Sequence, residues 1–176
     1  MSKRRQRGVA LFISLVLLLV LTIIGISAVQ ITSLEERMAR NTHDSVMAFQ
    51  SAESALREAE AWINANIVSV AGFVPAGNNG LYQSAAFGQQ ENWLIAATWT
   101  GGNSRSAATI VQGVAEQPRY IVEWIATVER DENPGMITSS YATLFDRIEI
   151  FRITARGVGG TANSTVLLQS TFGMVF

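Results

Sequence analysis

Cysteine is absent from this chain of 176 residues, and histidine occurs only once, as His43. Without cysteine, the chain can form neither a disulfide framework nor a thiolate metal site. A histidine with no second histidine or cysteine nearby lacks the neighbouring groups that a metal or catalytic site needs. We therefore expect His43 to be a solvated helix residue, and we expect no enzyme activity, no cofactor and no metal.

Charge is missing from one long stretch. Residues 9–34 contain no ionisable side chain, although four of the first seven residues are basic. As a helix, residues 9–29 alone would span about 32 Å at roughly 1.5 Å per residue, enough to cross a bilayer. The basic residues favour a cytoplasmic N-terminus, so the chain after residue 34 should lie on the outer side of the membrane.

Three interpretations of this apolar segment remain open. A cleaved secretory signal normally has an apolar core of about 7 to 15 residues, which is shorter than this one. A permanent single-pass anchor fits the length. The third interpretation uses Gly8, where the basic leader meets the apolar helix within one peptide bond. Residues 3–8 followed by Val9 resemble a class III prepilin leader, which is cut after its glycine on the cytoplasmic side and leaves the helix attached.

Helical spacing continues beyond the apolar run to about residue 63, with neither proline nor glycine between residues 35 and 63. Along this part, one stripe steps by three and four residues, as one face of a helix does. Its members are Ser45, Phe49, Ala52, Leu56, Ala59 and Ile63. The small residues among them would let a sheet approach the helix closely.

Alternating residues predict strands in the second half of the chain. Residues 119–129 place one set on a buried face, and the alternation returns at residues 147–156 and 165–172. The buried set is Tyr120, Val122, Trp124, Ala126 and Val128. A weaker strand is expected at residues 108–112, and residues 92–100 fit either a strand or a helical turn. These elements predict an α+β fold, in which a long N-terminal helix packs on an antiparallel sheet with Trp124 beneath Phe49, Leu56 and Ile63.

Two further segments are interpreted as turns. Residues 157–160 lack the lysine of a phosphate-binding loop and join two strands, so they are expected to form a hairpin turn. Residues 131–135 hold two acidic residues before Pro134 and Gly135. Their oxygen atoms are of the kind that calcium binds, but no twelve-residue loop with ligand spacing surrounds them. The four tryptophans are expected to be core or interface anchors.

Two stretches carry a family resemblance. Residues 36–41, Asp44 and residues 48–57 resemble the PilX family of minor type IV pilins, and so do residues 151–157 and 166–172. The resemblance implies a leader at residues 1–8, a transmembrane and assembly helix at 9–34, an amphipathic continuation at 35–65 and a periplasmic globular region at 66–176. It also implies cleavage between Gly8 and Val9 by a prepilin peptidase, with methylation of Val9.

The same resemblance implies a function in assembly. The protein would wait in the bacterial inner membrane and then join other minor pilins and the major pilin in a complex that primes the pilus and supports a tip adhesin. Cleavage after Gly8 would leave 9 basic and 14 acidic residues, a side-chain net of −5, which argues against a nucleic-acid partner. A type II secretion pseudopilin and a membrane-anchored periplasmic binding or sensor module are the alternatives.

One residue departs from the family pattern. Most pilins carry a glutamate five residues into the mature chain, and here that position is Ile13. In the family, this carboxylate is thought to neutralise the N-terminal amine of the subunit added just before. Its absence favours a position with no such amine to neutralise, at the distal end of the pilus. A low-copy subunit that simply tolerates the defect is the other explanation.

Overall fold

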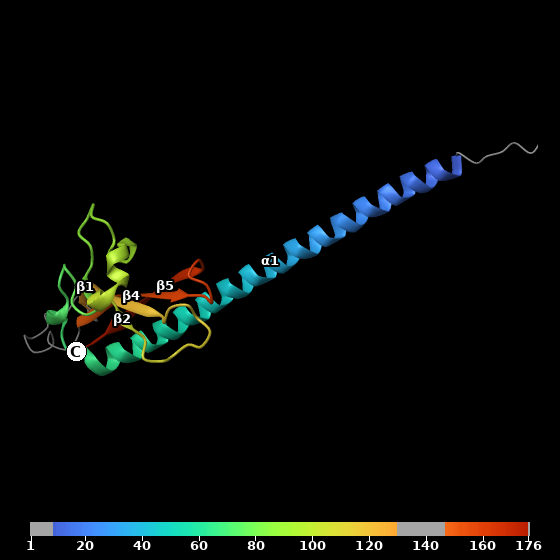
Figure 1. Ribbon diagram of the computed structural model, residues 1–176. Coiled ribbons are helices and arrows are strands. Elements are labelled where there is room, and N and C mark those ends of the chain that lie inside the picture. Colours follow the sequence, from blue (N-terminus) through green and yellow to red (C-terminus); the bar gives the residue numbers. More distant parts are fainter. Residues whose placement is uncertain (1–8, 130–146, 176) are drawn as a thin grey trace, which may run out of the picture. The chain divides into compact units, whose positions relative to one another are not determined.

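The structure is a computed structural model that describes residues 9–129 and 147–175. One long helix, α1 (Val9–Asn66), is followed by short 3₁₀ turns and a sheet, as Figure 1 shows. The chain divides into two compact units, one ending at His43 and the other beginning at Asp44. The predicted α+β fold, a long N-terminal helix packed on a sheet, is confirmed.

Helix α1 begins at Val9, where the apolar run begins, and it extends three residues beyond its predicted end at residue 63. The last turn is closed locally, because the Asn66 side chain donates to the Trp62 carbonyl oxygen at 2.9 Å. Two pairs on its surface, Glu36–Arg40 and Glu53–Arg57, form ion pairs at i,i+4. Both are exposed and contribute at most a few tenths of a kcal/mol each.

The sheet has the order β1-β3-β4-β5, with β2 also paired to β3. Its strands are β1 (Leu81–Gln83), β2 (Arg105–Ser106), β3 (Arg119–Glu129), β4 (Arg147–Val158) and β5 (Thr165–Met174). The long strands β3, β4 and β5 are antiparallel, and β3 has the predicted bounds. The short β1 pairs with β3 in parallel, so the sheet is mixed.

A β-bulge reverses the side-chain alternation of β3 near its end. Trp124 pairs with Phe151 and Ala126 with Ile150, which leaves Ile125 as the extra residue. After a bulge of one residue, every following side chain points to the other face. The prediction that Val128 is buried is therefore wrong, and Val128 is 47% exposed. Thr127 takes the helix-facing side instead and donates a hydrogen bond to Glu149.

The core lies between residues 48–63 of α1 and the adjacent face of the sheet. The helix contributes Ala48, Ser51, Ala52, Ala55, Ala59 and Ile63. From the sheet come fully buried side chains that include Val122, Phe151 and Ile153. Leu56 and Trp124 pack against this core and are partly buried. The buried stripe is therefore made mostly of alanine.

The prediction that Phe49 packs beneath the sheet is wrong, because Phe49 is 47% exposed. Its neighbour Ala48 is buried in its place. The predicted stripe followed helical spacing alone, whereas the buried face at this level is one residue away, where the small side chain of Ala48 allows the sheet to come close. Close packing at this face selects small side chains, and it turns Phe49 outward.

Residues 92–104 cover the other face of the sheet. They form three 3₁₀ turns, Asn92–Leu94, Ala96–Trp99 and Gly101–Asn103, which decides between the two alternatives for this segment. Hydrogen bonds attach the turns to the sheet: Tyr82 Oη donates to the Asn103 carbonyl oxygen at 2.8 Å. The Arg119 guanidinium donates to the Ser104 hydroxyl at 2.7 Å.

The strand expected at residues 108–112 is not formed. Its backbone N–H groups bind side chains instead of a neighbouring strand. Ala108 and Thr109 donate to the two carboxylate oxygens of Glu58 on α1, at 2.6 and 3.0 Å. Val111 donates to Gln117 at 3.0 Å. Because these donors are already satisfied, the segment has no need of a sheet partner.

Burial differences along α1 give a first prediction. Replacing the exposed Phe49 with alanine should lower the free energy of unfolding by less than about 1 kcal/mol, since surface substitutions rarely do more. The matched variant Ile63→Ala removes a fully buried side chain. It should cost about 2 to 5 kcal/mol. Urea unfolding of both variants measures this, and a larger loss for Phe49→Ala would contradict the exposed position of that ring.

Candidate assembly site

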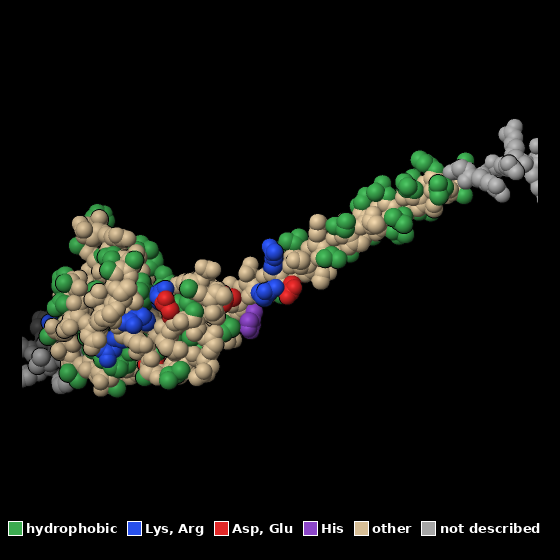
Figure 2. All heavy atoms as spheres, in the orientation of Figure 1, with side chains coloured by type: hydrophobic (Ala, Val, Ile, Leu, Met, Phe, Trp, Pro, Cys, Tyr) green, Lys and Arg blue, Asp and Glu red, His purple; other side chains and the backbone are tan. Residues whose placement is uncertain are grey.

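The apolar part of α1, residues 9–34, presents its hydrophobic side chains outward. Its large apolar residues are between 40% and 73% exposed within the chain. Figure 2 shows hydrophobic side chains along this segment and charged ones only after it. Among the described residues, α1 is the one helix long and apolar enough to cross a membrane. So much apolar surface is stable only in lipid or among other apolar helices.

Four of the five hydroxyl groups of this segment donate hydrogen bonds to the helix itself. Ser14 and Thr22 donate to carbonyl oxygens three residues earlier, at 2.8 and 2.7 Å. Ser27 and Thr32 donate to carbonyl oxygens four residues earlier, at 2.9 and 3.1 Å. A hydroxyl bonded in this way brings no unsatisfied group into an apolar environment. The segment can therefore move between lipid and a helix bundle without losing these bonds.

Of the three residues predicted for processing and assembly, Val9 and Ile13 lie in the first two turns of α1. Gly8 is outside the described residues, and Val9 is the first residue of α1. Ile13 is 52% exposed on the helix surface, so the position that usually carries a carboxylate presents an apolar side chain. A Cβ atom added at Gly25 would meet no atom within 4 Å. Gly25 therefore leaves an open notch where another helix can approach closely.

The globular unit is held to its own part of α1 by a backbone contact that the sequence pattern does not reveal. A Cβ atom at Gly157 of β4 would lie closer than 3.0 Å to backbone atoms of Ala48 and Ala52. Such a distance is not possible for real atoms, so only glycine fits. Gly157 was expected to belong to a hairpin turn, but it is a strand residue where helix and sheet touch.

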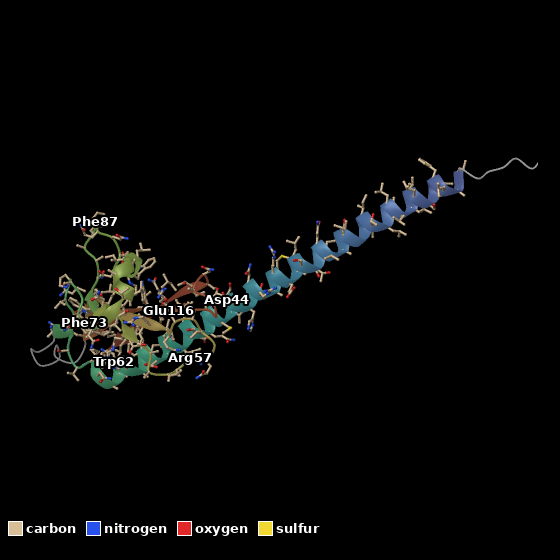
Figure 3. All side chains as sticks on the ribbon, in the orientation of Figure 1. Asp44, Arg57, Trp62, Phe73, Phe87 and Glu116 are labelled. Carbon is tan, nitrogen blue, oxygen red and sulfur yellow. The ribbon has the colours of Figure 1, made fainter. Side chains whose placement is uncertain are left out.

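Asp44, the first residue of the second compact unit, joins α1 to the turn between β4 and β5 by hydrogen bonds. Its Oδ1 atom accepts a hydrogen bond from the Thr161 backbone N–H at 3.0 Å, and its Oδ2 atom accepts one from the Thr161 hydroxyl. Gly159 packs against the same aspartate, since a Cβ there would lie closer than 3.0 Å to it. Asp44, labelled in Figure 3, was visible in sequence only as part of the family resemblance.

A buried charge cluster lies on the sheet face that residues 92–104 cover. Glu123 is fully buried, and it accepts hydrogen bonds from Arg152 Nε at 2.8 Å and Asn92 Nδ2 at 2.9 Å. Arg152 also pairs with Glu91 at 2.5 Å. Burial alone would lower the pKa of Arg152, but its two carboxylate partners raise that pKa above the ordinary value. Glu123 alternates with the residues that the sequence pattern places on the buried face of this strand, so that pattern does not predict its burial.

A second polar cluster lies near the bulge. The Glu149 carboxylate accepts hydrogen bonds from Trp124 Nε1 and the Thr127 hydroxyl, both at 2.7 Å. The bulge brings Thr127 to this position. Elsewhere the Arg105 guanidinium lies 3.9 Å above the Trp62 ring. These contacts hold β2 and the end of β3 in place, and the polar side chains in them bind other side chains of the domain.

No arrangement for catalysis or metal binding is found in the part of the chain that the structure describes. His43 is an exposed residue of α1. Among the described residues, no group of three histidine, cysteine, aspartate or glutamate side chains could hold a metal ion. The acidic turn predicted at residues 131–135 lies outside the described residues. The described residues form a long helix with an apolar first part and a globular domain with a packed core.

Comparison with known families agrees with this arrangement. Residues 7–57 match the family model described as PilX N-terminal, and residues 40–174 match that of the type IV pilus assembly protein PilX C-term. No curated protein and no solved structure matches the chain. The family is structural and is not a known enzyme family. The two matches span nearly the whole chain, which belongs to the PilX family of type IV pilus assembly proteins.

Proposed function

We propose that this protein is a minor pilin that joins a priming complex at the tip of a type IV pilus and supports an adhesin there. The observation that carries the proposal is the exposed, charge-free segment 9–34 with Ile13 at the position of the usual glutamate. Before assembly the segment crosses the inner membrane, with its N-terminus in the cytoplasm. During assembly it leaves the lipid and packs among the apolar helices of other minor pilins and of the major pilin.

The tip position follows from the cost of burying charge. A shaft subunit without the carboxylate would leave the N-terminal amine of its neighbour unpaired inside an apolar bundle, which costs several kcal/mol. A subunit with nothing above it has no amine to neutralise and does not meet this cost. Ile13 therefore suits the distal subunit better than a subunit of the shaft.

Processing by a prepilin peptidase gives a direct test of the membrane interpretation. We expect the intact mass of the assembled protein to show loss of residues 1–8 and one added methyl group on Val9. The variant Gly8→Leu should stay at full length in the membrane and should not enter pili, because the peptidase cuts after glycine. A mature protein that still carries residues 1–8 in the presence of the peptidase would argue for a permanent anchor.

Imaging tests the position within the pilus. Epitope-tagged copies of the wild type should lie at one end of intact pili. The variant Ile13→Glu supplies the missing carboxylate and should allow copies to enter the shaft. Leu17→Glu, one turn further along the same helix, is the matched control and should not. Labels of the wild-type protein scattered evenly along the shaft would refute the tip position.

Two alternatives remain for comparison. A pseudopilin of type II secretion uses the same leader and helix, and deletion of the gene would then impair protein secretion while leaving pili intact. A membrane-anchored binding or sensor module would keep its leader, so the intact mass separates it from both pilin-like functions. The family matches favour pilus assembly over either alternative.

A further inference from the structure

The two edges of the sheet are built differently. At the β1 edge, the strand has three residues, and Gln83 donates its backbone N–H to the Val74 carbonyl oxygen at 3.1 Å. Val74 also forms a bridge with Tyr82, so this edge is covered by the chain itself. At the other edge, β5 is ten residues long and pairs with β4 on one side. Within residues 9–129 and 147–175, no strand pairs with its other side (Figure 1).

The register of β5 identifies the backbone groups that this edge presents. Gly159 donates its N–H to the Ser164 carbonyl oxygen at 2.9 Å, so these two residues are a hydrogen-bonded pair. The β4–β5 pairing then continues without a bulge from Val158–Thr165 to Glu149–Met174. In an antiparallel ladder, every second residue bonds to the neighbour and those between point both backbone groups outward. The outward residues are Thr165, Leu167, Gln169, Thr171 and Gly173.

This edge lacks the features that usually protect a free strand. Natural proteins place lysine, other charges or proline on an open edge, or they keep the strand short. Residues 165–175 contain no charged residue and no proline. With ten residues and five outward pairs of N–H and C=O groups, β5 is long enough for a full additional strand.

The core is also incomplete on this side. The helix-facing side chains of β4, Phe151, Ile153 and Ala155, are fully buried. Their partners on β5, Phe172 and Leu168 among them, are only partly buried. The Ser170 hydroxyl, which faces the same way, donates to Glu60 of α1 at 3.0 Å. A further strand with apolar side chains toward α1 would complete the burial of this row.

We propose that β5 is a docking edge for an extended segment of a different pilus subunit, which adds a strand to this sheet. The segment alternates apolar residues toward α1 with uncharged polar residues on the other side. Backbone hydrogen bonds along the edge supply affinity, and the partly exposed row on β5 selects the side chains. The proposal rests on family membership and does not depend on a position at the tip.

A second copy of this chain is a poor occupant for geometric reasons. Antiparallel pairing of two β5 strands relates the two domains by a two-fold axis perpendicular to the sheet. The helix portions from residue 44 onward would then run in opposite directions. Both of these portions continue upstream into apolar segments that need the same membrane or the same filament. A segment of another subunit has no such restriction.

Photo-crosslinking of the full-length protein in cells with the complete pilus system tests the proposal. A benzophenone amino acid at Thr171, whose side chain is exposed, should form an adduct with an extended segment of one other subunit. The same probe at Asn163, an exposed residue in the turn before β5, is the control and should not capture that segment. An adduct with a second copy of this chain, or no adduct at position 171, would overturn the proposal.

A pair of substitutions distinguishes the contribution of the Thr171 backbone N–H to partner binding from that of its side chain. Thr171→Pro removes one outward N–H that bonds to nothing within the described sheet, and proline is tolerated at such an edge position. Thr171→Ala keeps the N–H and removes only the hydroxyl and methyl groups. Co-purification with the crosslinked subunit should fall at least tenfold for proline and less than twofold for alanine. Equal recovery with a folded proline variant would overturn the proposal, and if the proline variant does not fold, the crosslink decides.

Discussion

Replacing Gly157 with alanine is expected to destabilise the globular unit by about 3 kcal/mol, the upper end of the usual range for overpacking, although alanine is the smallest possible change. The new Cβ would lie closer than 3.0 Å to backbone atoms of Ala48 and Ala52. Backbone cannot rotate out of the way as a side chain can, so helix and sheet must move apart, and overpacked cores typically lose about 1 to 3 kcal/mol. Urea unfolding of the full-length protein in detergent, followed by tryptophan fluorescence, measures the loss.

Gly102→Ala is the matched control for this prediction. A Cβ at Gly102 would meet no atom within 4 Å, and its φ angle is not in the positive region. Replacing glycine with alanine at such a position normally stabilises a protein slightly, because the unfolded chain has less conformational entropy to lose on folding. The free energy of unfolding should therefore fall in Gly157→Ala and rise slightly in Gly102→Ala. Equal stability of Gly157→Ala and the wild type would mean that the helix does not touch β4 there.

The second large effect concerns the buried charge of Glu123. Substitution Arg152→Met should cost about 3 to 5 kcal/mol, because it leaves a fully buried carboxylate without its cation. The free energy of unfolding in urea measures this cost. Arg57→Met is the surface control, since Arg57 pairs with Glu53 in an exposed i,i+4 ion pair. That variant should change stability by less than about 0.5 kcal/mol.

A double substitution distinguishes loss of the ion pair from loss of packing. In Glu123→Leu/Arg152→Met, neither charge remains, so the unpaired carboxylate that makes the single variant costly is gone. Replacing both members of a buried pair by apolar side chains is often neutral or stabilising. The double variant should therefore recover most of the stability lost in Arg152→Met. If it is no more stable than that single variant, the guanidinium acts mainly through its packing.

The local pattern of apolar and polar residues was enough to predict the long helix and strand β3. The uncharged run at residues 9–34 specifies an apolar helix, since most of its residues are apolar and it is long enough to cross a bilayer. Alternation between residues 119 and 129 predicted β3 with the bounds that the structure has. The apolar helix, the isoleucine at position 13 and the family resemblance could all be recognised from residues that are neighbours in the sequence. Period and composition are local properties, so no tertiary information was needed.

The tertiary structure decided which faces meet. Phe49 fits the helical stripe by spacing, yet the sheet approaches so closely at Gly157 that the alanine face is buried instead. The bulge at Ile125 turns Thr127 to the helix-facing side of the sheet and Val128 to the opposite side, although their alternation continues unchanged in the sequence. Asp44 bonds to Thr161, 117 positions away, and Glu123 is buried only because residues 92–104 fold over it. Register, close approach and burial depend on residues far apart in the chain, and local periodicity carries no information about them.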